Sequence, residues 1–252
     1  MFGLLNIPKV QLSILLFLIY LSALKVYPNI TSIYLITVSL TFCILSDLLF
    51  TYIKKRKLFV PLSAIATGLI IALIVDLNAK WYELAVICAL AMASKNFLRP
   101  SGGHIFNPAG FGLLFGGLIF VLPVSWWGVS FQNFSATGGP AFGWQFLILI
   151  SPILVSAYRM RRFVSITAFL LTYILLSGSF ISFLDPTVLF FSLVMLPEPM
   201  TSPVDYKRQA MYGVLVAVLS YLMSANSVIA GFLPDVLIPA LLLGNLVFFK
   251  FR

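Results

Sequence analysis

Charged residues are scarce in this 252-residue chain. Only 9% of the residues are Asp, Glu, Lys or Arg, whereas 61% are hydrophobic. A water-soluble protein cannot bury so much apolar surface, because its outside has to face water. The composition excludes a soluble protein and predicts a single integral membrane domain over residues 1–252, with almost no chain left for a second, soluble domain.

Ligand residues for the common metal and redox centres are also scarce. His104 is the only histidine, which excludes bis-histidine haem ligation within the chain. Cys43 and Cys88 lie in the middle of apolar segments and outside any CxxC spacing, so we expect buried, inert thiols. An iron–sulfur ligand shared with another subunit is the less favoured alternative, because a cluster usually needs four ligands. The sequence has no zinc-ligand set, P-loop or nucleophile elbow, and we predict no catalytic residue and no metal site.

Acidic residues are fewer than basic ones, 7 against 16, which gives a net charge of +9. The basic residues lie in short clusters between apolar runs, a pattern that orients membrane spans. We therefore expect no nucleic-acid partner. The first apolar run has neither a strongly basic start nor a small-residue cleavage site, so we expect it to be the first span and not a signal peptide.

The apolar runs predict an all-α, polytopic transmembrane bundle of about ten helices. We place them at residues 9–27, 30–53, 59–77, 80–95, 109–126, 144–158, 163–184, 186–197, 209–224 and 228–249. The fourth, sixth and eighth are short for a bilayer crossing, so we expect tilted, broken or half-spanning segments there.

The basic clusters predict one orientation. The cluster at 54–57 ends the second helix and the cluster at 159–162 ends the sixth, and an even number of helices separates them. The positive-inside rule then places both clusters, both termini and the loops at 96–108 and 198–208 on the cytoplasmic side of a bacterial-type inner membrane. The loop at 127–143 falls outside.

The segment SKNFLRPSGGHIFNP, residues 94–108, places glycines and cations between two membrane helices. Irregular backbone at membrane depth is tolerated where it is buried in protein or lines a cavity. Lys95 and Arg99, beside a helix that starts after Asn107, could cradle a phosphate or another anion. A re-entrant or capping loop whose cations meet lipid headgroups explains the same residues, and on the residues alone we favour it.

The segment MLPEPMTSP, residues 195–203, contains three prolines. Each proline fixes φ and removes a hydrogen-bond donor, so the loop is stiff and cannot continue the helix. Thr201 and Ser202 then present hydroxyls at fixed positions. These hydroxyls could bind a ligand, or they could satisfy backbone groups of a rigid turn.

Asp47 is an ionisable residue inside the second span, seven positions before Lys54. Charged side chains are costly in hydrocarbon, so such a residue is a candidate for an ion path. We prefer the interpretation that Asp47 snorkels or pairs with the basic cluster at 54–57.

The two loops resemble the signatures of a known family. SKNFLRPSGGHIFNPAGFG and MLPEPMTSPVDYKRQAMYGVLVAVLSYL are similar to segments of the NqrB/RnfD family. Its members are the B subunit of the sodium-translocating NADH:quinone reductase and the D subunit of the Rnf electron-transport complex. Glu198 stands where the family signature usually has Asp. The order and spacing of the segments agree over most of the chain.

The resemblance implies a ten-helix fold similar to urea-channel architecture, in which bound flavins pass electrons across the bilayer. The implied partners are other membrane and flavoprotein subunits of an electron-transport complex, with quinone and membrane lipid as further candidates. In the family an outward-facing Thr is esterified to FMN, and the matching stretch here, residues 132–137, ends at Thr137. The acidic residue of that motif is absent and the stretch is one residue shorter, so a plain Ser/Thr/Gly turn is the alternative.

We therefore predict a membrane subunit of an ion-translocating oxidoreductase, not an enzyme alone, that passes electrons through bound flavin. FMN would be covalent at Thr137, and riboflavin or FMN would bind non-covalently between the two loops. The residues predicted for the second site are Lys95, Arg99, His104, Phe106, Asn107, Thr201 and Ser202. A small-solute channel or carrier of the same architecture without redox activity is the alternative, and a structural anchor for other subunits is the third possibility.

Overall fold

The computed structural model describes residues 7–26, 28–55, 60–100, 103–130 and 144–251. Within these ranges the chain has eleven α-helices and no β-strand, which confirms the predicted all-α class. Two of the helices, α2 and α3, are long and apolar enough to cross a bilayer, and the other apolar helices are shorter.

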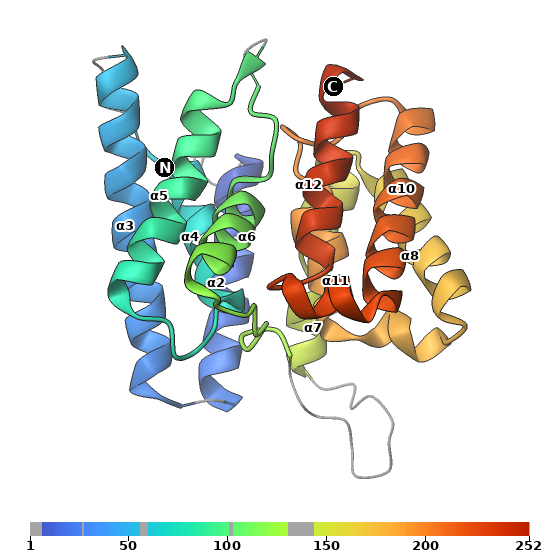
Figure 1. Ribbon diagram of the computed structural model, residues 1–252, viewed down its shortest axis with the longest axis horizontal. Coiled ribbons are helices and arrows are strands. Elements are labelled where there is room, and N and C mark those ends of the chain that lie inside the picture. The colour runs from blue at the N-terminus through green and yellow to red at the C-terminus, as the bar shows by residue number, and fades with distance from the viewer. Residues whose placement is uncertain (1–6, 27, 56–59, 101–102, 131–143, 252) are drawn as a thin grey trace.

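The first half of the chain folds into five helices (Figure 1). They are α2 (Pro8–Val26), α3 (Ile30–Lys55), α4 (Leu62–Ile74), α5 (Trp81–Phe97) and α6 (Pro108–Phe120). Helix α3 packs against α4 and α5, and α5 packs against α6. A Cβ on Gly112 of α6 would lie 2.3 Å from the carbonyl oxygen of Ile87 on α5, so these two helices pack backbone against backbone.

The second half repeats this arrangement with more interruptions. It contains α7 (Trp144–Ile150), the π-helical turn η2 (Leu154–Arg159), α8 (Phe163–Ser177), the 3₁₀ turn η3 (Phe180–Leu184), α9 (Pro186–Phe190), the π-helical turn η4 (Phe191–Met195), α10 (Tyr206–Ala225), α11 (Ser227–Phe232), α12 (Leu237–Phe248) and the 3₁₀ turn η5 (Phe249–Phe251). Helix α8 packs against α10, and α10 against α12. Gly213 of α10 permits this approach, because a Cβ there would lie 2.5 Å from the carbonyl oxygen of Ser165.

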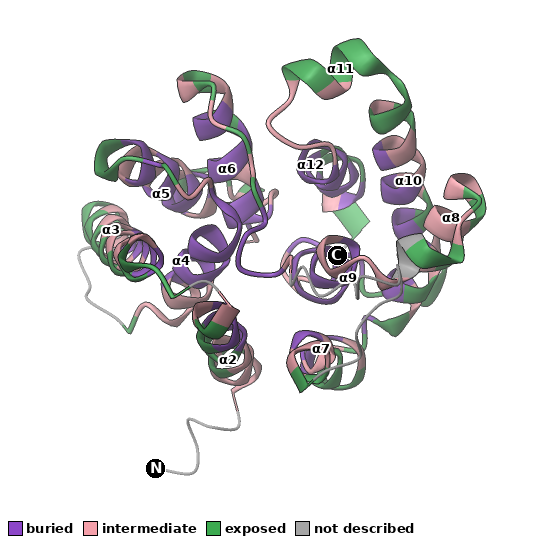
Figure 2. Cartoon of the chain, turned by 90° about the horizontal axis from the view of Figure 1, so that it is seen from below, coloured by how far each residue is buried: buried purple, intermediate pink, exposed green. Residues whose placement is uncertain are grey.

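Figure 2 shows the two halves side by side, with α2–α6 in one group and α7–α12 in the other. Across the boundary α2 meets α7, and α6 meets α12.

Short helices lie beside this boundary. Helices α4 and α6 have 13 residues each and α12 has 12, so each is about 20 Å long at 1.5 Å per residue, less than the hydrocarbon core. The predicted interruptions of the sixth and eighth spans are confirmed by η2 and η4. The predicted fourth span is α5, which has 17 residues and is about 26 Å long, still shorter than the hydrocarbon core. The segment after α6, residues 121–130, is apolar too, so hydropathy continues where that helix has ended.

The basic clusters gather at one end of the molecule, the upper end in Figure 1. Lys54 at the end of α3 donates a 2.8 Å hydrogen bond to the carbonyl of Asn96 near the end of α5. Arg162 before α8 bonds Ser202 at 2.9 Å, and the Arg208 guanidinium of α10 lies 4.6 Å from a C-terminal aromatic ring. We call this the basic end and the opposite one the far end.

Candidate functional site

Asn107 joins the two halves at the basic end. It is the N-cap of α6: its Oδ1 accepts a 3.0 Å hydrogen bond from the Gly110 amide, and Pro108 occupies the first helical position. Its Nδ2 donates at 3.3 Å to the carbonyl of Met195, the last residue of η4. One side chain therefore fixes the start of a short helix of the first half against the end of a short helix of the second.

Asn245 on α12 completes this contact from a fully buried position. Its Oδ1 accepts a 3.0 Å hydrogen bond from the Asn107 amide, and its Nδ2 donates at 2.8 Å to the Tyr212 hydroxyl and at 3.4 Å to the Thr201 carbonyl. Each of these hydrogen bonds satisfies a polar group that is buried away from water. We call the contacts around Asn107 and Asn245 the basic-end junction.

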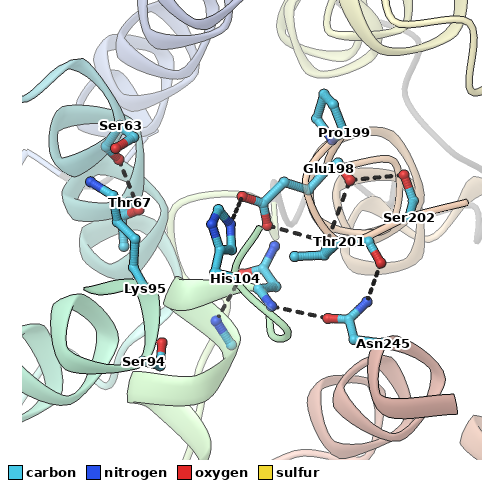
Figure 3. Close-up of polar contacts among 12 residues, drawn as sticks. Ser63, Thr67, Ser94, Lys95, His104, Glu198, Pro199, Thr201, Ser202 and Asn245 are labelled. Carbon is cyan, nitrogen blue, oxygen red and sulfur yellow. Dashed lines mark hydrogen bonds and ion pairs between the residues drawn. The ribbon is translucent and has the colours of Figure 1, made fainter. Parts of the chain in front are cut away.

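The two signature loops meet at this junction, as predicted (Figure 3). The Nε2 of buried His104 lies 3.1 Å from Oε1 of Glu198. The Thr201 hydroxyl donates at 3.4 Å to the other carboxylate oxygen. Glu198 has one methylene more than the Asp of the similar family signature, which extends its reach toward His104.

The hydroxyl of Ser202 holds the second loop together. It donates a 2.8 Å hydrogen bond to the Glu198 carbonyl and accepts a 2.9 Å bond from Nε of Arg162. Arg162 is buried and also donates from Nη2 to the Pro199 carbonyl at 3.4 Å. The sequence indicated Arg162 only as part of a basic cluster that orients the membrane spans. It did not predict that Arg162 donates hydrogen bonds to this loop.

Lys95 forms a buried ion pair. Its Nζ lies 2.6 Å from Oδ2 of Asp47, and Nδ2 of Asn96 donates at 2.9 Å to Oδ1 of the same carboxylate. The preferred interpretation paired Asp47 with the 54–57 cluster, and this was wrong, because the packing of α5 on α3 brings Lys95 closer. The charge of Lys95 is largely committed to Asp47.

A cavity of about 60 Å³ lies between the halves at the basic-end junction. Its polar lining consists of Lys9, Ser63, Thr67, Lys95, His104, Asn107, Ser156 and Glu198. The lining combines cationic, hydroxyl and amide groups with apolar side chains, a mixture that small-molecule sites in proteins share.

The remaining predicted residues lie away from this cavity. Arg99 is partly buried, and Phe106 packs its ring on Phe111 with the ring centroids 5.4 Å apart. Neither residue lines the cavity, and neither do Thr201 and Ser202. Thr137 lies outside the residues that the structure describes.

A second junction, at the far end, was not predicted. The amides of Ser125 and Trp126 donate to the Ile74 carbonyl at 3.0 and 3.2 Å, and the Gly128 amide donates to Leu73 at 2.8 Å. The indole of Trp127 donates to the Ala72 carbonyl at 2.9 Å. The last turn of α4 is thus capped almost entirely by the segment after α6.

Trp126 extends the far-end junction to the second half. Its indole donates a 2.9 Å hydrogen bond to Oδ2 of Asp235. Oδ1 of Asp235 accepts bonds from the Leu237 and Ile238 amides at 2.7 and 2.9 Å, which caps α12. The sequence signal was an Asp just before an apolar run, which indicates an N-cap but cannot reveal the indole partner.

The model of the NQR2, RnfD, RnfE family matches residues 5–138, more than half of the chain, including α2–α6 and the loop that carries His104. The comparison with curated proteins finds no match. Members of the matched family are membrane subunits of the bacterial Rnf and Nqr complexes. This chain belongs to the NQR2, RnfD, RnfE family, and it is an integral membrane subunit of an ion-translocating oxidoreductase complex with other subunits as its partners.

Proposed function

We propose that this chain passes electrons across the bilayer within its complex, with FMN esterified to Thr137. The observation that carries the proposal is the extent of the family match, since residues 5–138 include the stretch at 132–137 that resembles the flavin attachment motif. FMN supplies one- and two-electron chemistry when bound. The protein supplies attachment, position and the surroundings that set the potential.

The basic-end junction supports a role for the signature loops in holding the halves together. Asn107 and Asn245 fix the backbones of both loops, and His104 and Glu198 close the cavity between them. The boundary between two groups of membrane helices is where membrane carriers place their sites. The non-covalent flavin predicted here stays a prediction, and we derive no electron-transfer step through it.

The proposal also requires that residue 137 faces away from the cytoplasm. The described chain on both sides of this position, namely the segment after α6 and the start of α7, lies at the far end (Figure 1). The basic end would be cytoplasmic, because Lys and Arg are retained on that side. In a variant without Cys43 and Cys88, a membrane-impermeant thiol reagent added outside should label a cysteine at position 137 and not one at exposed Lys207. The reverse labelling would contradict this orientation.

Intact-mass measurement tests the covalent flavin. The chain would be coexpressed with its cognate flavin transferase, and the purified protein is expected to gain the mass of one esterified FMN. Thr137→Ala should lose this adduct together with the colour that survives acid precipitation, while Ser135→Ala serves as the matched control and should keep both. A wild-type chain of unmodified mass would overturn the proposal.

A water-sized solute channel is the second candidate function. The observation in its favour is the cavity of about 60 Å³ between the halves, lined by hydroxyl, amide and charged groups. Vesicles containing the purified chain would then swell faster in an isotonic solution of a small neutral solute than vesicles without protein. An equal rate, together with the FMN adduct, would favour electron transfer.

A further inference from the structure

Two exposed stripes run along the outer side of the second half. On α8 the exposed positions recur every fourth residue, at Phe163, Thr167, Leu171 and Leu175. On α10 they follow one helical face, at Met211, Val214 and Leu222. The Thr167 hydroxyl donates to the Phe163 carbonyl at 3.0 Å, so its polar group is satisfied within the helix. Helix α8 packs against α10, and Figures 1 and 2 show the two side by side at the outer edge of the molecule.

An exposed cation lies at the basic end of each stripe. Lys207 precedes the first residue of the α10 stripe by four positions and therefore lies on the same helical face. Arg161 precedes the first residue of the α8 stripe by two positions. Two contacts hold these ends together: Nε2 of Gln209 donates at 3.0 Å to the Arg161 carbonyl, and the ring centroids of Phe163 and Tyr206 lie 5.5 Å apart. The two cations therefore flank one small surface.

The backbone at Arg161 is unfavourable for arginine. Its φ is 53°, in the left-handed region where a Cβ is strained and glycine is preferred. The next residue, Arg162, is buried and bonds Ser202 at 2.9 Å. The left-handed turn thus directs one arginine into the protein and leaves the other exposed at the end of the α8 stripe. Backbone geometry gives no reason for an arginine at position 161, which leaves its charged side chain as the reason.

The starts of both helices add to the positive potential of this surface. Helices α8 and α10 both begin at the basic end, and each helix start carries about half a positive charge. An acidic residue, Asp205, also lies here, and its Oδ2 caps α10 by accepting a 3.1 Å hydrogen bond from the Arg208 amide. The two exposed cations and the two helix starts outweigh this carboxylate, so the surface favours an anion.

We propose that this surface binds an anionic phospholipid, with the phosphate at Arg161 and Lys207 and an acyl chain along the two stripes. The α8 stripe is about 18 Å long at 1.5 Å per residue, which covers one leaflet of a hydrocarbon core about 30 Å thick. A phospholipid joins a phosphate to an apolar chain of this length, whereas an acidic protein surface would leave the stripes unmatched. The site lies outside the basic-end junction and does not depend on flavin.

Lipid titration of the purified full-length chain tests the proposal. Dioleoyl phosphatidylglycerol and dioleoyl phosphatidylcholine have the same acyl chains and differ in net charge. Each would be titrated into the protein in detergent, and bound lipid would be counted by native mass spectrometry. Phosphatidylglycerol is expected to bind about tenfold more tightly, because each cation near an anionic headgroup contributes about fivefold. Equal affinities for the two lipids would overturn the proposal.

Single substitutions locate the site. Arg161→Gly removes the cation and relieves the left-handed backbone, so the variant should fold and bind phosphatidylglycerol about fivefold more weakly. Lys207→Gln should weaken binding by a similar factor. Lys80→Gln removes an exposed cation before α5, away from this surface, and is the matched control that should bind like wild type. Wild-type affinity in both Arg161→Gly and Lys207→Gln would contradict the proposed position.

Two further measurements distinguish the lipid from other anions. Inorganic phosphate at the concentration of the lipid should not displace phosphatidylglycerol, and displacement would make this a site for a soluble anion instead. The assembled complex should retain phosphatidylglycerol through purification, and a complex with Arg161→Gly should retain less. If assembly with the other subunits removed the lipid, the surface would belong to a protein partner and the proposal would be wrong.

Discussion

The two junctions solve the same structural problem with different chemistry. At each, a short helix of one half begins against the end of a short helix of the other. The basic-end junction uses the side-chain amides of Asn107 and Asn245, and it borders a cavity with charged walls. At the far-end junction the backbone amides of residues 125–128 cap α4 within the first half. The two halves are joined there by the Trp126 indole on Asp235 and by the Val124 amide, which donates to the Pro234 carbonyl at 3.1 Å. The basic-end junction therefore depends on two buried side-chain amides, whereas the far-end junction combines one side-chain pair with a backbone hydrogen bond that substitution leaves in place.

Removal of the central amide should have the largest effect. Asn245→Leu keeps the branched shape but leaves the Asn107 amide and the Thr201 carbonyl without this partner, while the Tyr212 hydroxyl keeps its bond to the Leu196 carbonyl. Each unsatisfied buried group costs about 1–3 kcal/mol, so the variant should lose roughly 3 kcal/mol or more of stability. Thermal unfolding of the purified protein in detergent would measure this loss. Leu246→Ala, at a neighbouring exposed site, is the control, and equal midpoints for the two variants would show that the network does not hold the halves together.

The far-end junction should be less sensitive to a side-chain change. Asp235→Asn keeps the cap of α12 but loses the carboxylate that accepts from the Trp126 indole, so about 2 kcal/mol of stability should be lost. Asp185→Asn is the matched control, since Asp185 caps α9 in the same way through the Thr187 amide. The difference between their unfolding midpoints isolates the indole contact. If both variants lost the same amount, the indole bond would contribute nothing.

The smallest effect is expected at the pair between the two loops. Glu198→Asp shortens the side chain by one methylene and should break the 3.1 Å contact with His104. Glu198 is partly exposed, so the loss should be at most about 1 kcal/mol. The unfolding midpoint would reveal it. A loss as large as that of Asn245→Leu would mean that the charged pair, and not the amide network, is the main link between the loops.

The helices were predictable from the sequence, and their ends were less so. Apolar runs located most spans to within a few residues, because lipid requires such runs. The predicted tenth span at 228–249 was wrong as a single helix, because the chain there forms α11 and α12 with a break between them. The length of α6 was overestimated, since the segment after it is equally apolar. Hydropathy reports where a chain is buried in the membrane and does not distinguish helix from extended backbone.

The candidate site was predictable where local pattern determines contacts. The sequence Asn107-Pro108 predicted the start of a helix. The resemblance of the two loops to the family signatures predicted that they lie together. The partner of Asp47 was not predicted, because it depends on the packing of α5 against α3, which no local spacing encodes. The far-end role of Trp126 was missed for the same reason.

The ends of the short helices also have an electrical consequence. A helix carries about half a positive charge at its start and about half a negative charge at its end. At the basic end the negative end of η4 meets the positive start of α6 through Asn107. At the far end the negative end of α4 meets the segment whose Trp126 bonds Asp235 at the start of α12. Each half thus supplies one sign to each junction, so separating the halves would remove the opposite partial charge that each of these helix ends faces across the boundary.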